Sequence, residues 1–136
     1  MKKPSLFVLA LLAAMAVGAA EDYDGSKPMI CAPANGHDCT PAEKTCKRLK
    51  PEEGRDVNLY IDVAKMQVKT PYRTAELPIQ NVSNNTKSLI LQGTSLEFVW
   101  AATVNRTTGR LTVAIADREG AYVIFGQCKL GEASSQ

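Results

Sequence analysis

The stretch Leu96-Glu-Phe-Val-Trp-Ala-Ala-Thr-Val104 decides the fold class of this chain. Apolar side chains recur at every second position, namely Leu96, Phe98, Trp100, Ala102 and Val104. A period of two places successive side chains on opposite faces of an extended strand. The stretch therefore predicts a β-strand with one face on an apolar core.

The same period continues on both sides of this strand. It predicts further strands near residues 59–63, 66–68, 77–82, 87–92, 111–115 and 121–125. The segments between the last strands, 105–109 and 117–120, carry the Asn, Asp and Gly residues that hairpin loops favour. In the last strand the pattern places Ala121, Val123 and Phe125 on the inner face. Long amphipathic helices are absent, so we predict an all-β fold, an antiparallel meander that forms a small barrel or sandwich.

Residues 1–20 have the three parts of a secretory signal peptide. Lys2 and Lys3 form a charged start, a twelve-residue apolar run follows, and small residues end the segment. The run is shorter than the ~20 residues of a membrane-spanning helix. We therefore expect cleavage after Ala19 or Ala20, a periplasmic or secreted location, and no stable membrane insertion of the mature chain.

The rest of the chain is predicted to form one domain in two parts. Residues 21–56 contain four prolines and three glycines, and we predict an irregular segment there, with one helical turn near 41–46. Residues 57–130 form the antiparallel β domain, and residues 131–136 form a flexible tail. Because some outward positions of the last strands are apolar too, the irregular segment is expected to cover part of the outer face.

Four cysteines in an exported chain predict two disulfides; they are Cys31, Cys39, Cys46 and Cys128. Three pairings are possible, and sequence alone does not choose among them. The compact stretch between Cys39 and Cys46 favours a local bridge, which leaves Cys31 to pair with Cys128. The six residues between Cys39 and Cys46 fit no common zinc site, and there is one histidine. We therefore predict a disulfide-tethered N-terminal segment, no metal site and no cofactor.

Charge and motifs exclude several classes of function. Loss of Lys2 and Lys3 reduces the 16 basic residues to 14, which equals the 14 acidic residues. A neutral mature chain does not favour a nucleic-acid partner. The chain has no Gly-x-Ser-x-Gly motif and no glycine-rich phosphate-binding motif. We therefore predict that it is not an enzyme.

Four residues are the candidate binding residues. Phe98, Trp100 and Phe125 would line a cavity if the strands enclose one, and core packing is the alternative. His37 is the single histidine, and a solvated loop position is its alternative. The leading hypothesis is a non-enzymatic binding or interaction protein whose partner is an unknown protein or small ligand. The second hypothesis is a β-barrel that binds a small molecule, which an enclosed apolar volume above ~300 Å³ would favour.

Several segments resemble a group of small exported bacterial proteins, mostly from proteobacteria. They are Asp38-Cys39, Cys46-Lys-Arg, Ser88-Leu-Ile-Leu-Gln-Gly93, Thr108-Gly109-Arg-Leu-Thr112 and Gly120-Ala-Tyr-Val-Ile-Phe-Gly-Gln-Cys128. This resemblance spans roughly residues 30–128 and implies export and a four-cysteine disulfide pattern. More distantly, the chain is similar to periplasmic lysozyme inhibitors, which are small disulfide-linked β-barrels. That similarity implies an inhibitor-like interaction with a protein partner.

Overall fold

The structure is a computed structural model that describes residues 22–71 and 75–132. The predicted signal peptide and the end of the predicted tail lie outside the described residues. The described part is all-β and antiparallel, as predicted. Its strands are β1 (Met29–Cys39), β2 (Lys47–Leu49), β3 (Leu59–Asp62), β4 (Gln67–Lys69), β5 (Leu77–Pro78), β6 (Asn81–Asn84), β7 (Ser88–Thr94), β8 (Phe98–Asn105), β9 (Arg110–Asp117) and β10 (Ala121–Leu130).

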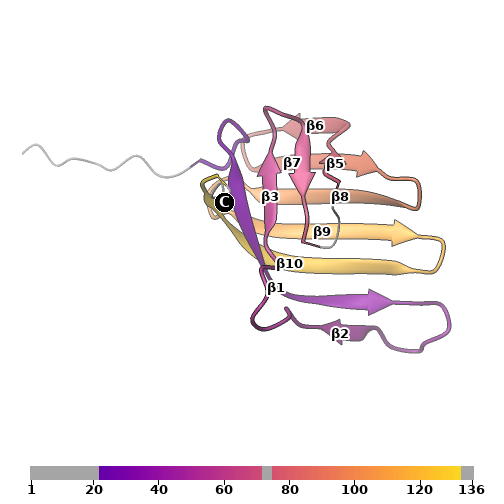
Figure 1. The fold of residues 1–136 in the computed structure, drawn as a ribbon. Helices are drawn as coiled ribbons and strands as arrows, with labels where there is room; N and C mark the ends of the chain where they lie inside the picture. The colour runs from indigo at the N-terminus through magenta and orange to yellow at the C-terminus, as the bar shows by residue number, and fades with distance from the viewer. Residues whose placement is uncertain (1–21, 72–74, 133–136) are drawn as a thin grey trace, which may run out of the picture.

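These strands form one sheet that curls into a half-barrel (Figure 1). The order across the sheet is β5-β4-β3-β1-β10-β9-β8-β7-β6, and β2 pairs with the second half of β1. In Figure 1, β3 lies in front of the long strands β8 to β10 and runs across them. The sheet therefore has a front wall, made by β3 to β5, and a back wall, made by β7 to β10 and β1.

The two ends of this strand order meet through consecutive residues of the chain. The segment predicted as one strand over 77–82 is divided into β5, next to β4, and β6, next to β7. Between them, Ile79 N donates a hydrogen bond to Met66 O (2.8 Å) and Gln80 N donates one to Gln92 O (2.9 Å). The backbone therefore crosses here from the front wall to the back wall.

The segment 21–56, predicted to be irregular, contains β2 and also β1, the longest strand of the described residues. It pairs with β10 from Met29 opposite Leu130 to Cys39 opposite Ala121. The register shifts once, between Pro33 and Asn35. Proline has no N–H to donate to a neighbouring strand, and a register shift is a place where a strand tolerates this. Pro33 therefore does not exclude a strand at this position.

The remaining part of that segment contains a turn where one helical turn was expected. Glu43 N donates to Thr40 O at 3.3 Å, and the described residues include no helix. The outer face is also not covered, because the segment has become part of the sheet. Val99 is 53% exposed and Phe125 is 39% exposed.

Cross-strand register arranges the inward side chains of the back wall in rows. From the floor upward the rows are Leu89–Val104–Leu111, then Leu91–Ala102–Val113–Ile124, then Gly93–Trp100–Ile115–Tyr122. The members of the first row are fully buried. The turn residue Leu96, expected to continue the inward face, is fully exposed because the chain reverses there with a hydrogen bond from Ser95 N to Phe98 O.

The inner face of β10 differs from the predicted one. Tyr122 lies opposite Ile115 and Ile124 lies opposite Val113, so Tyr122 and Ile124 point inward and Phe125 points outward. Residues 121–125 are apolar on both faces, so their own alternation does not distinguish inside from outside. The register against β9 determines which face of β10 points inward.

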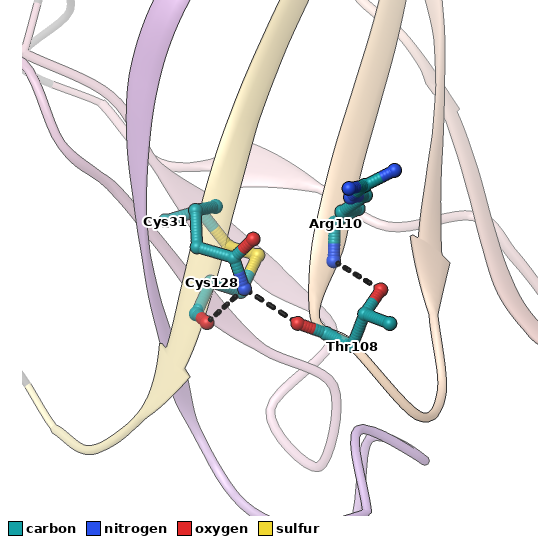
Figure 2. Close-up of a disulfide and its surroundings, with 5 residues drawn as sticks. Cys31, Thr108, Arg110 and Cys128 are labelled. Atoms are coloured by element: carbon teal, nitrogen blue, oxygen red, sulfur yellow. Dashed lines mark hydrogen bonds between the residues drawn. A yellow bond between two sulfur atoms is a disulfide. The ribbon is translucent and has the colours of Figure 1, made fainter.

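Both disulfides have the preferred pairing, Cys31–Cys128 and Cys39–Cys46. We call the first the floor disulfide, because it is almost fully buried below the first row and joins β1 to β10. Figure 2 shows it beside the turn that holds Thr108. The side chain of Gln127 donates hydrogen bonds to Thr108 O and Cys128 O, which fastens this turn to β10.

The residues before β1 close this end of the half-barrel. Tyr23 is buried, its N–H donates to Arg106 O (3.1 Å), and a Cβ on Gly109 would lie 2.7 Å from its ring. The Arg106 guanidinium donates to both carboxylate oxygens of Asp22, at 3.0 and 2.7 Å. The floor end is therefore packed and held by both covalent and polar contacts.

Candidate functional site

A cavity of about 570 Å³ lies above this floor, between the two walls. It opens to solvent beside the exposed residues Lys50 and Pro51. Most of its lining is apolar: Pro33, Leu49, Pro51, Val57, Leu59, Ile61, Val68, Leu77, Phe98, Trp100, Ala102, Val113, Ile115 and Ile124. Protein interiors normally contain few voids larger than a water molecule. A space of this size is therefore a distinct feature of the fold.

Small residues in the middle row of the back wall explain why the space is not filled. Ala102 contributes one methyl group to this row. On the other side of Ile124 the row continues to Gly36 in β1 and then to Leu49 in β2. A Cβ on Gly36 would lie 2.6 Å from Val123 O, so the backbone itself leaves no place for a side chain. At Ala102 and Gly36, the side chains of this row therefore fill little of the space between the two walls.

The front wall contributes a second apolar surface. Ile61 in β3 lies opposite Val68 in β4, which lies opposite Leu77 in β5. Leu59 belongs to the same wall, and all four residues line the cavity. The cavity is thus enclosed by inward residues from strands that are far apart in the sequence.

The segment 46–57, which we call the rim segment, forms one side of the opening. Its residues Leu49, Lys50, Pro51 and Val57 line the cavity. Cys39–Cys46, which we call the rim disulfide, ties its start to the end of β1.

The other end of the rim segment is fastened to β3 by a hydrogen bond. Tyr60 Oη donates to Asp56 Oδ2, and Asn58 N donates to Asp56 Oδ1 at 2.9 Å. The hydrogen bond from Tyr60 lowers the pKa of the Asp56 carboxyl below its ordinary value, because it favours the charged form. Asp56 is therefore a charged anchor at neutral pH.

The structure brings together two of the four candidate binding residues. Phe98 and Trp100 both line the cavity. Phe125 lies on the opposite face of β10 and is partly exposed. His37 is an exposed residue of β1, opposite Val123, where a loop was expected.

Trp100 contacts the back of the cavity and is 7% exposed. A Cβ on Gly93 would lie 2.6 Å from Trp100 Nε1 and 2.7 Å from Cε2, so the glycine provides the space for the indole ring. The Nε1 atom is buried and has no hydrogen-bond partner within the described part of the chain. The ring therefore acts as apolar surface, and its N–H is not accessible from the cavity.

Polar lining residues are few; they are Asn35, Lys50, Thr70, Asp117 and Tyr122. Asp117 lies opposite Phe98, in the row nearest the opening. Its Oδ1 accepts hydrogen bonds from Glu119 N (2.8 Å) and Gly120 N (2.9 Å), which stabilise the hairpin turn between β9 and β10. Lys50 makes no hydrogen bond or ion pair with the described residues.

Sequence reasoning missed Tyr122, Ile124 and the rim segment as parts of this site. The first two were assigned to the wrong face, and the rim segment was treated as an irregular covering of the outer face. A usable signal was the combination of Gly36 and Ala102, small residues at inward positions of otherwise apolar strands. Their alignment in one row depends on register, which the sequence does not display.

Comparison of the chain with protein-family models, with curated proteins and with solved structures finds no match. Within residues 22–71 and 75–132, no three His, Cys, Asp or Glu side chains come together as a metal-binding group. The same residues contain no helix whose length and apolarity would let it span a bilayer. The two disulfides indicate an oxidising environment.

Proposed function

We propose that this protein is a non-enzymatic binding protein that holds a small, mostly apolar molecule in the cavity between its two walls. The observation that carries the proposal is the cavity itself, about 570 Å³ with a mostly apolar lining. Sites for small molecules commonly measure about 300–1,000 Å³ and combine apolar walls with a few polar groups. The volume lies within this range, and the cavity opens to solvent on one side.

Location in the periplasm or outside the cell is part of this proposal. Disulfides persist in oxidising compartments, and the predicted signal peptide of residues 1–20 would direct the chain there. The closed end supports a binding role, because the floor disulfide and Tyr23 stiffen the fold below the cavity. A rigid scaffold lowers the entropy that binding has to overcome.

The chain contains its own probe for a test of this proposal. Trp100 is the single tryptophan and lines the cavity, so its fluorescence responds to a molecule that enters. The oxidised mature protein is unfolded in denaturant, refolded to remove any bound molecule, and titrated with dodecanol and with 1-anilinonaphthalene-8-sulfonate. We expect saturable binding of one molecule per chain.

A cavity-filling variant and a matched control locate that binding. Ala102→Leu adds three carbon atoms to the middle row, whereas Ala101→Leu adds the same atoms to the partly exposed opposite face of β8. We expect binding to be lost in Ala102→Leu and kept in Ala101→Leu, with both variants folded by circular dichroism. Absence of saturable binding to the wild-type protein, or equal binding by folded Ala102→Leu, would contradict the proposal.

A further inference from the structure

The polarity of the cavity changes from the floor to the opening. At its inner end, the cavity is lined by the buried apolar side chains of Ile61, Val68, Ala102 and Val113. Asp117 and Lys50 are found at the opening, where the cavity reaches solvent. Burial of a polar group without a partner costs free energy, so a ligand is most stable with its apolar part at the inner end of the cavity and its polar end at the opening.

The two charged lining residues differ in whether they already have hydrogen-bond partners among the described residues. The Asp117 carboxylate is held within its own turn, where its Oδ1 atom accepts two backbone hydrogen bonds. Lys50 has no partner among the described residues. Its ammonium is therefore the charge at the cavity that remains available to a ligand.

Two further basic residues of the rim segment lie in β2, which pairs with β1. Lys47 and Arg48 precede Lys50 with one residue between, and both are exposed. Lys47 lies opposite Asp38 and Arg48 lies opposite His37, and the acidic residues that follow Lys50, Glu52 and Glu53, do not line the cavity. Glu52 is already paired with Arg55 at 3.2 Å.

From these observations we infer that the ligand is an anionic amphiphile, with an elongated or compact apolar body inside the cavity and a carboxylate, sulfate or phosphate head beside Lys50. The inference rests on the proposed function, since it names the class of molecule that the same cavity takes. Opposite charge at the opening orients the ligand and contributes modestly to its affinity, because the ammonium is exposed to water.

Three ligands with one twelve-carbon chain and different heads test the charge of the head group. Dodecanoate, dodecanol and dodecyltrimethylammonium are titrated into the oxidised protein at low salt, below their micelle concentrations, with Trp100 fluorescence as the signal. We expect dodecanoate to bind roughly two- to fivefold more tightly than dodecanol, the range that an exposed ion pair supplies. Dodecyltrimethylammonium should bind most weakly, and the differences should disappear at 1 M salt, where the screening length is about 3 Å.

Two lysine variants assign the preference to a residue. Lys50→Gln should remove the preference for dodecanoate over dodecanol without weakening dodecanol binding. Lys87→Gln, at the start of the β7 hairpin and outside the cavity lining, should keep the preference. Equal binding of dodecanoate and dodecanol by the wild type, or a preference that survives Lys50→Gln, would overturn the anionic head while leaving the cavity as a binding site. Failure of all three ligands to bind would overturn both proposals.

Discussion

Replacement of Trp100 separates the contribution of its ring from that of its buried N–H. Truncation of a buried aromatic residue to alanine costs about 3–5 kcal/mol through lost burial and the void it leaves. Trp100 Nε1 is buried without a hydrogen-bond partner among the described residues, and removal of an unpaired N–H returns about 1 kcal/mol. The net expectation for Trp100→Ala is a loss of about 2–4 kcal/mol. Trp100→Phe keeps most of the apolar ring and removes the unpaired N–H, so its change should stay within about 1 kcal/mol.

Urea unfolding followed by circular dichroism measures both variants, because neither retains a tryptophan for fluorescence. For a domain of about 110 residues, each kcal/mol corresponds to about 4 °C in melting temperature, so Trp100→Ala should melt roughly 8–16 °C lower than the wild type. The urea dependence m should not change, since the unfolded surface is nearly the same. If Trp100→Phe lost as much stability as Trp100→Ala, the N–H would have a stabilising partner and the reasoning would fail. An unchanged Trp100→Ala would show that the ring is not part of the packed wall.

Four other predictions concern the disulfides, the glycine next to Trp100, the single histidine and the acid end of the stability curve. The rim disulfide should be reduced first by a mild thiol, with alkylation and mass spectrometry as the measurement, because its cysteines are accessible while the floor disulfide is buried; loss of the floor disulfide should also cost more, about 4.7 against 2.5 kcal/mol in the chain-entropy account. Gly93→Ala should cost about 1–3 kcal/mol in urea unfolding, since its Cβ would overlap both the Pro78 carbonyl oxygen and the indole, and a neutral result would contradict this close packing. His37→Ala should change the free energy of unfolding by no more than about 0.5 kcal/mol, measured by a thermal melt, because the side chain is exposed; a large loss of stability or of dodecanol binding would assign His37 a role. The pKa of Asp56 is lower in the folded protein than its unfolded value of about 3.8, so the charged carboxylate stabilises the fold at pH values above 3.8. This stabilisation is lost as the pH falls through the pKa of the folded state, so the stability difference between wild type and Tyr60→Phe should shrink on acidification. A difference that stays constant with pH would contradict the role of the Asp56–Tyr60 hydrogen bond.

Local patterns in the sequence were sufficient for the strands of the back wall. Alternation along 96–104 predicted β8, and the Asn, Asp and Gly residues at 105–109 and 117–120 predicted the hairpins on either side of β9. These predictions succeed because strand alternation and turn chemistry depend on residues close together in the chain. The spacing of Cys39 and Cys46 favoured the rim disulfide for the same reason.

Other features depend on residues that are distant in the sequence. β1 was missed because its prolines and glycines suggest turns, while its strand conformation is stabilised by pairing with β10, some 97 residues away at the floor disulfide. The inner face of β10 was misassigned because both of its faces are apolar, and only register against Val113 and Ile115 places Ile124 and Tyr122 inside.

The sequence by itself therefore determined the all-β class, the hairpins and the favoured cysteine pairing, each a property of short segments. Tertiary structure alone decided the cavity. Ala102 and Gly36 look unremarkable in their own strands, and they leave a space only because register places them in the same row, with Val113 and Ile124 between them. The front wall stands opposite that row because the chain crosses between walls at Ile79 and Gln80. A cavity is a relation between surfaces from separate parts of the chain, and no local pattern in the sequence encodes the distance between them.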